Sequence, residues 1–275
     1  MVSHSSPLRK TMLVLVIFSN LFLGFPFWAD AFCHEIQLTR TTAPRFMRVA
    51  AQPRSVTIQW LGHAAFLLTS SKGTQVLMDP HGRMGQSLEL SPQVVTTSHL
   101  HGNHSSIWMA QGNPIVLHGL DPEDGDWQRV HRVIRDLSIY TVPTYHDGEM
   151  GLLRGKNAAF VVSVDGLCLA HLGDLGHLFN KKQLELMGKI DVLLVPLGQG
   201  GARIDSRDAA KVVRQIKPKV AIPQHYRWEG YMEEFVGNFD RVRRLDGNSV
   251  KLSKDTLTSE LEVVVLKDTL AEQQD

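Results

Sequence analysis

Short apolar segments separated by polar turns recur along the chain from about residue 55 onwards. Residues 56–60 alternate between apolar and polar positions, which is typical of a half-buried strand. Two further strands are predicted at 65–69 and 75–78, with a polar turn at 70–73 between them. This pattern predicts a β-meander at the start of the folded domain.

Strands and helices alternate in the rest of the chain. Continuous apolar runs predict buried strands, and apolar positions at helical spacing predict helices. The predicted strands are 94–98, 114–117, 138–143, 158–164, 167–171, 190–196, 218–223 and 261–266, and the predicted helices are 105–111, 179–187, 206–216 and 229–245. Early strands followed by alternating strands and helices favour a layered α/β domain.

The N-terminal segment has a different pattern. Arg9 and Lys10 precede a nearly continuous apolar stretch at 12–28, and Ala29-Asp30-Ala31 fits a signal-peptidase site. We therefore predict a signal peptide at 1–31 and export to the periplasm or beyond. An uncleaved N-terminal membrane anchor is the alternative. We interpret residues 32–54 as a linker, 55–268 as the folded domain and 269–275 as a tail.

Composition limits the possible partners. Of the 275 residues, 43% are hydrophobic and 21% charged, as in ordinary globular proteins, and the formal net charge is +1. Such a charge gives no electrostatic reason to expect nucleic-acid binding. There are two cysteines. Cys168 lies in an apolar run that predicts a core position, and a disulfide with Cys33 is compatible with export but has no other support in the sequence.

The densest group of candidate metal-ligating residues follows the predicted strand at 94–98. His99, His101 and His104 fall within six residues. In extended backbone the first two share a face, and a turn at Gly102 returns the third towards them. Converging imidazoles are ligands for a first-row transition metal, and Zn²⁺ is the first expectation, with Mn²⁺ or Fe as alternatives.

Metal-ligating side chains follow other predicted strands in the same way. His146, Asp174 and His225 each come shortly after a strand end. Ligands that arrive from separate strands can meet at one sheet edge. Imidazoles for each ion and a carboxylate to bridge them are what a centre of one or two ions requires.

These motifs resemble the metallo-β-lactamase superfamily. The resemblance covers roughly residues 55–227 and is nearer to lactonase-like and phospholipase-like metal-dependent hydrolases than to antibiotic-degrading enzymes. It implies a four-layer αββα sandwich. It also implies hydrolysis of an ester, amide, lactone or phosphoester in a small-molecule or lipid-like substrate. The motifs that carry it are the histidine cluster at 99–104, Trp60-Leu61-Gly62-His63, Met78-Asp79-Pro80, Arg154-Gly155-Lys156-Asn157, residues 171–177, residues 191–196 and Ile222-Pro223-Gln224-His225-Tyr226.

The resemblance also implies a ligand set. Two ions would share the carboxylate of Asp174 as a bridge. The first would be held by His99, His101 and His146, and the second by His104 and His225. Around them, His63, Asp79, His171, His177 and Tyr226 are candidates for orienting ligands or touching substrate.

Asn103 departs from the family pattern, which has an aspartate there. That aspartate ligates the second ion and orients the attacking water, whereas an asparagine offers one neutral carbonyl oxygen. Asp174, Asn103 and His104 are therefore the candidate catalytic residues, and three outcomes compete: two ions with the second held weakly, one ion with activity, or metal binding with weak or lost hydrolysis. Asp147 is a candidate substitute carboxylate.

Overall fold

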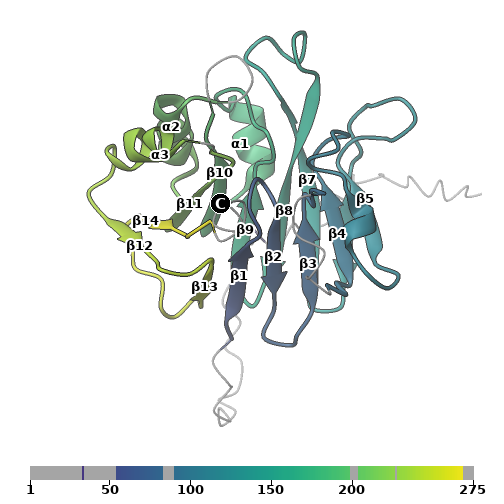
Figure 1. Cartoon of the computed structure of the whole chain (residues 1–275), viewed down its shortest axis with the longest axis horizontal. Coiled ribbons are helices and arrows are strands. Elements are labelled where there is room, and N and C mark those ends of the chain that lie inside the picture. Colours follow the sequence, from purple (N-terminus) through teal and green to yellow (C-terminus); the bar gives the residue numbers. More distant parts are fainter. Residues whose placement is uncertain (1–32, 34–53, 83–89, 199–203, 227, 269–275) are drawn as a thin grey trace, which may run out of the picture.

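Two β-sheets packed face to face form the body of the protein (Figure 1). The computed structural model describes residues 33, 54–82, 90–198, 204–226 and 228–268. The six-stranded sheet contains, in spatial order, β13 (Ser249–Leu252), β1 (Val56–Trp60), β2 (Phe66–Thr69), β3 (Gln75–Met78), β4 (Val94–Thr97) and β5 (Ile115–His118). The eight-stranded sheet contains β12 (Val242–Arg244), β14 (Glu262–Val265), β11 (Val220–Gln224), β10 (Val192–Pro196), β9 (Leu167–His171), β8 (Lys156–Val164), β7 (Leu137–Tyr145) and β6 (His131–Ile134).

Burial follows the sequence pattern strand by strand. β1, β2 and β3 are antiparallel neighbours, which confirms the predicted meander. In β1 the alternate residues Val56, Ile58 and Trp60 are buried in the core between the sheets. β4, β10 and β11 are buried at every position because both of their faces are covered.

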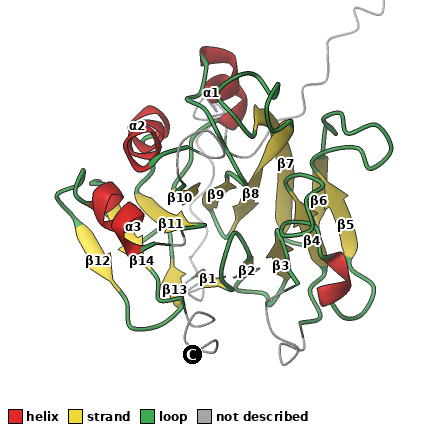
Figure 2. Ribbon diagram, turned by 45° about the horizontal axis from the view of Figure 1, so that its top comes forward, coloured by secondary structure: helices red, strands yellow, loops and turns green. Residues whose placement is uncertain are grey.

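The α-helices cover the outer face of the eight-stranded sheet (Figure 2). They are α1 (Lys181–Met187), α2 (Ser206–Ile216) and α3 (Glu229–Val236). Helix α2 begins where the sequence predicts, since the Asp205 side chain accepts the backbone N–H of Asp208 at 2.8 Å. On the outer face of the six-stranded sheet, the 3₁₀-helix η1 (Ile107–Met109) covers a small apolar cluster. None of the helices in the described ranges is long and apolar enough to span a membrane.

The predicted α/β sandwich is confirmed, but several elements differ from expectation. The helix predicted at 229–245 ends at Val236, and its last residues form the edge strand β12 instead. Only a 3₁₀ turn forms within 105–111. The sequence pattern does not predict β6, β12 and β13: the residues of β6 and β12 are largely exposed, and the short strand β13 contributes two buried residues, Val250 and Leu252, so no apolar run marks these strands.

Most of the predicted N-terminal organisation lies outside the described residues. Residues 1–31, the tail at 269–275 and nearly all of the linker at 32–54 fall there. Cys33 is the exception. It is buried, forms a disulfide with Cys168 on β9, and its carbonyl accepts the backbone N–H of Lys189 at 2.8 Å. This bridge attaches Cys33 to the core beneath the helices.

Candidate metal centre

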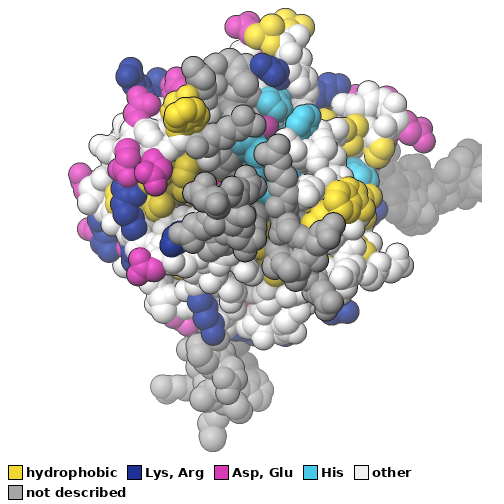
Figure 3. Space-filling view, viewed as in Figure 1, with side chains coloured by type: hydrophobic (Ala, Val, Ile, Leu, Met, Phe, Trp, Pro, Cys, Tyr) yellow, Lys and Arg dark blue, Asp and Glu magenta, His cyan; other side chains and the backbone are white. Residues whose placement is uncertain are grey.

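Strand ends bring the distant metal-ligating residues to one place. His99 follows shortly after β4, His146 follows β7 and His225 follows β11, while Asp174 lies three residues beyond β9. Strands β9, β10 and β11 are parallel, so their carboxyl ends share an edge of the sheet. The four side chains line a cavity of about 490 Å³, and Figure 3 shows histidine side chains gathered on this face of the molecule.

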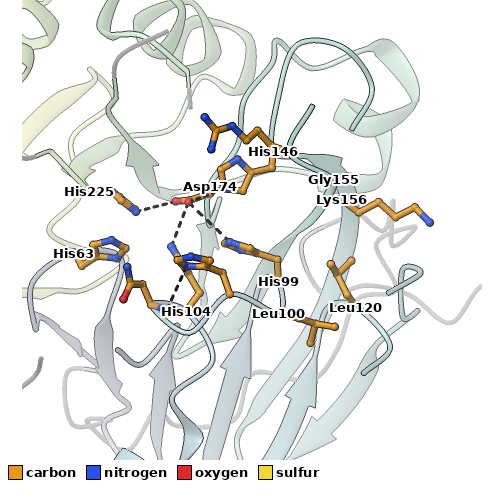
Figure 4. Close-up of a pocket in the computed structure, with 13 residues that line it drawn as sticks. His63, His99, Leu100, His104, Leu120, His146, Gly155, Lys156, Asp174 and His225 are labelled. Atoms are coloured by element: carbon orange, nitrogen blue, oxygen red, sulfur yellow. Dashed lines mark hydrogen bonds and ion pairs between the residues drawn. The ribbon is translucent and has the colours of Figure 1, made fainter. Parts of the chain in front are cut away.

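Asp174 occupies the centre of the cluster (Figure 4). Its Oδ2 atom lies 2.9 Å from His146 Nε2, 3.3 Å from His104 Nε2 and 4.0 Å from His99 Nε2. Its Oδ1 atom lies 3.1 Å from His225 Nε2. The two carboxylate oxygens therefore face different imidazoles, as a bridging ligand between two ions would.

The loop that carries Asp174 is held from behind by Asn157. The Asn157 side-chain oxygen accepts the backbone N–H of Asp174 at 3.1 Å, and its amide donates to Leu172 O at 2.9 Å. The preceding residue, Gly173, has φ +56° and packs against Ser98, where a Cβ atom would lie 2.5 Å from the Ser98 Cβ. Only glycine fits this close approach without moving Asp174.

Asp79 orients His104 from the other side. This carboxylate is fully buried, and its Oδ2 lies 2.8 Å from His104 Nδ1. It also accepts the backbone N–H of Ser98 at 2.7 Å and the Ser98 hydroxyl at 2.5 Å. This contact leaves Nε2 of His104 directed at Asp174, the arrangement by which a carboxylate sets the tautomer and orientation of a metal-binding imidazole.

For both His104 and Asp174, burial and the neighbouring charges shift the pKa in opposite directions. Burial by itself would lower the pKa of His104, but the carboxylates of Asp174 and Asp79 outweigh it and raise the pKa to about 10. Burial would raise the pKa of Asp174, yet His225 and His104 hold it well below its usual range. The pKa of His99 falls to about 3 because of burial and the neighbouring His104. Near pH 7 Asp174 is therefore an anion and His99 a neutral donor, as metal ligands must be, whereas His104 carries a proton that a bound metal ion would displace.

The donor set fits a transition metal. Three groups have ligand atoms that all lie within 4.8 Å of one another: His99, His146 and Asp174; Asp79, His99 and His104; and His63, His104 and His225. The buried Nε2 of His99 has no hydrogen-bond partner among the described residues. A buried imidazole nitrogen without a partner costs free energy unless it binds something, and a metal ion would satisfy it.

His101 and Asn103 lie at the rim of the cavity. Both line it, but His101 is exposed, with its ring centroid 6.0 Å from that of His99 and 6.2 Å from that of His104. His101 does not belong to the clustered groups of histidine, cysteine and acidic residues found within the described ranges. The roles predicted for both therefore stay predictions.

Asp147 has a different role from the substitute ligand considered from the sequence. It is buried, and its two oxygens accept four backbone N–H groups of the following loop at 2.6–3.1 Å. These bonds outweigh the effect of burial and lower the pKa of Asp147. The carboxylate thus holds the loop at 148–155, which begins beside His146. Because its oxygens are bonded to these backbone N–H groups, Asp147 is not placed as a metal ligand.

Three further candidates, His171, His177 and Tyr226, do not line the cavity. The Nε2 of His171 bonds to Ala64 O at 2.8 Å, and its Nδ1 accepts the N–H of Gly173 at 3.2 Å, so this ring links β9 to the loop after β1. His177 accepts the N–H of Tyr145 at 3.0 Å. The ring of Tyr226 packs against Trp60. These contacts hold the three side chains in place, and the orienting or substrate-contacting roles predicted for them stay predictions.

His63 lines the cavity, as do residues that sequence reasoning did not place in the site. Its ring centroid lies 3.6 Å from that of His225, and burial together with His225 lowers its pKa. The additional lining residues are Leu100, Leu120, Arg154, Gly155 and Lys156. Residues 154–156 belong to a motif of the resemblance, whereas the two leucines carry no chemical signal that would have marked them.

Comparison with known proteins decides the family. Residues 57–225, more than half of the chain, match the model of the β-lactamase superfamily domain. The chain belongs to the β-lactamase superfamily. A UPF0173 metal-dependent hydrolase from Carboxydothermus hydrogenoformans is 30% identical over 217 residues, which cover 71% of this chain and 95% of that protein. A second UPF0173 relative, from Thermococcus kodakarensis, is 31% identical over 62% of this chain and 84% of its own length.

A solved structure agrees with this assignment. The chain is similar to a Thermotoga maritima protein described as a Zn-dependent hydrolase of the metallo-β-lactamase superfamily. Its TM-score is 0.62 at 32% identity, and the match covers 77% of this chain and 98% of that one. The present chain is accordingly a metal-dependent hydrolase of the metallo-β-lactamase superfamily, and its histidine and aspartate cluster lies within the matched region.

Proposed function

We propose that this superfamily member is a hydrolase with a centre of two ions, with zinc as the resident metal. The observation that supports this most directly is the central place of the Asp174 carboxylate, whose Oδ2 lies near His146 and His104 and whose Oδ1 lies near His225. His99, His101 and His146 would hold the first ion, and His104 and His225 the second. When bound, such ions lower the pKa of a water molecule towards neutrality and polarise the scissile carbonyl or phosphoryl group.

The chain's own residues organise that chemistry. Asp79 holds the His104 ring in one orientation, and Asn157 fixes the backbone of Asp174. Asp174 and His104 are buried, which strengthens the electrostatic interactions between them. The geometry is rigid because each ligand loop is attached to a strand end, and such pre-organisation is what hydrolytic centres need.

For the substrate, we propose an ester, amide, lactone or phosphoester in a small-molecule or lipid-like compound. Leu100 and Leu120 supply apolar surface to the cavity, which suits an acyl chain or ring. Arg154 and Lys156 line the same cavity, and within the described residues Arg154 forms no ion pair. A free guanidinium at the rim favours a substrate that carries an anionic group.

We also propose that the protein is exported. The disulfide between Cys33 and Cys168 supports this, because such bonds persist in oxidising compartments. The apolar stretch at 12–28 is the second support.

The test is metal content together with turnover. Protein purified without chelators should hold close to two zinc ions per chain by elemental analysis, and should hydrolyse members of a panel of esters, lactones, amides and phosphodiesters. Asp174→Ala and His101→Ala should each lose metal and activity. Absence of a transition ion from the wild-type protein, or an unchanged rate in either variant, would refute the assignment.

A second function is favoured by one observation, the asparagine at 103. In that alternative the protein binds metal or a ligand with hydrolysis weakened or lost. It predicts little or no turnover by the wild type on the panel and a gain of turnover in Asn103→Asp. Wild-type turnover that Asn103→Asp does not increase rejects it.

A further inference from the structure

The second ion site proposed above lacks one donor. The metallo-β-lactamase resemblance places an ionised carboxylate at position 103, and this chain has Asn103 at the cavity rim. A neutral amide is a poor ligand for zinc, so His104, His225 and Asp174 alone would leave the site with three protein donors.

His63 lies where a fourth donor would be needed. Its ligand atom lies within 4.8 Å of those of His104 and His225, and these three imidazoles form one of the clustered groups. The ring centroid of His63 is 3.6 Å from that of His225 and 4.9 Å from that of His104. Figure 4 shows His63 and His225 on one side of Asp174, with His99 on the other.

The backbone holds His63 in this place. The residue has φ +51°, which is uncommon for a side chain larger than glycine. Its carbonyl accepts the indole N–H of Trp60 at 2.9 Å and the backbone N–H of His225 at 3.0 Å. The loop that carries His63 is therefore fastened to the loop that carries His225, so the two rings keep a fixed separation.

A purely structural histidine would look different. His171, on the neighbouring strand β9, is buried with hydrogen bonds at both ring nitrogens. By contrast, the buried Nδ1 atom of His63 has no hydrogen-bond partner among the described residues. Backbone strain together with a buried nitrogen that lacks a partner is an unfavourable combination for a residue whose only role is packing.

We propose that His63 is a direct ligand of the second ion and takes the place of the missing aspartate, which rests on the two-ion function proposed above. The second site then consists of His63, His104, His225 and the shared carboxylate of Asp174. It carries one neutral imidazole more and one negative charge fewer than the pattern with aspartate. A nitrogen-rich site of this kind favours Zn²⁺ or Co²⁺ over Mn²⁺.

The experiment measures metal binding instead of activity. Full-length wild type, His63→Ala and His63→Gln are stripped with a chelator, and Zn²⁺ is titrated back by calorimetry with elemental analysis of the loaded protein. We expect two equivalents in the wild type. In both variants the first equivalent should keep its affinity, and the second should weaken by more than about 100-fold, beyond the 10–100-fold that loss of an outer hydrogen-bond partner costs.

Two further variants separate ligation from packing. His81→Gln is the matched control, because this buried histidine packs against His63 at 5.5 Å between ring centroids but lies outside the clustered groups found within the described ranges. It should change the second affinity by less than about tenfold. In the double variant His63→Ala/Asn103→Asp, the restored carboxylate should recover the second ion, whereas damage to packing would not be rescued.

The outcomes distinguish this proposal from the proposed function. A wild type that binds two ions while both His63 variants retain the second at unchanged affinity overturns the role of His63 and leaves the two-ion centre intact. Loss of both equivalents in the His63 variants, without rescue by Asn103→Asp, also overturns it. A wild type that binds one ion or none overturns both.

Discussion

Breaking the disulfide between Cys33 and Cys168 should destabilise the protein substantially. The two residues are 135 positions apart in the sequence, so the bond closes a long loop in the unfolded chain. In the chain-entropy model, closing a loop of this length adds about 5 kcal/mol to the free energy of unfolding, and measured effects are commonly smaller than this value. We therefore expect loss of the disulfide to lower the free energy of unfolding by about 3–5 kcal/mol.

The folded state adds specific contacts to this entropic term. Cys33 is buried against the helix-side core, and its carbonyl accepts the N–H of Lys189. For a domain of this size, 1 kcal/mol corresponds to about 2–4 °C in the thermal midpoint, so the expected shift is about 6–20 °C. Cys168 lies near the start of β9 and Asp174 lies beyond its other end, so the metal content should remain unchanged.

The assay is a thermal scan of oxidised protein, of protein reduced with a phosphine, and of the variant Cys33→Ala/Cys168→Ala. A dithiol reductant is avoided because it would bind the metal, and bound metal itself shifts the midpoint. The variant scanned without reductant is the control for this effect. Two thiols that react with an alkylating reagent in protein isolated under oxidising conditions, or a midpoint shift below about 2 °C, would refute the reasoning.

Three other predictions concern the support of the metal centre. Asp79→Ala should weaken metal binding by about 10–100-fold in a chelator competition, because His104 loses the carboxylate that orients it, and unchanged affinity would contradict this. Gly173→Ala should cost at least about tenfold in metal affinity, since its Cβ would collide with Ser98 and move the adjacent carboxylate; a Gly166→Ala control in the open turn before β9 should not. Asp147→Asn should lower the free energy of unfolding by about 3 kcal/mol at pH 7, because charged acceptors are lost from four backbone N–H groups. The pKa of Asp147 is lowered in the folded state, so this stabilisation is fully present above the unfolded pKa of about 3.9 and is lost as the pH falls through the folded pKa. A difference in the free energy of unfolding between wild type and variant that persists unchanged at pH 2.5 in denaturant titrations would be inconsistent with this explanation.

Local sequence patterns predicted the strands that are buried on both faces and the strands in which apolar and polar residues alternate. The meander at 56–78, the buried strands β4, β10 and β11 and the start of α2 at Asp205 all follow from apolar periodicity and capping. Those patterns are local because burial of one strand face dictates which residue types occupy it. The residues of β6 and β12 are largely exposed and β13 has two buried residues in four, so no apolar run marks these three strands.

The metal centre shows the same division. The identity of the ligand candidates His99, His104, His146, Asp174 and His225 was readable, because imidazoles and carboxylates after strand ends are a chemical signal in the sequence. Their meeting around one carboxylate was decided by the parallel register of β9, β10 and β11 and the packing of two sheets.

Tertiary structure alone also separated residues of the same type. From the sequence, His63 and His171 were equivalent candidates near the site. In the fold, His171 has both ring nitrogens bonded to backbone groups, whereas His63 lies beside His225 with a buried nitrogen that has no partner in the described part of the chain. The sequence specifies which metal-ligating side chains are present. Only the packing of the fold sets the distances between them, and metal ligation depends on those distances.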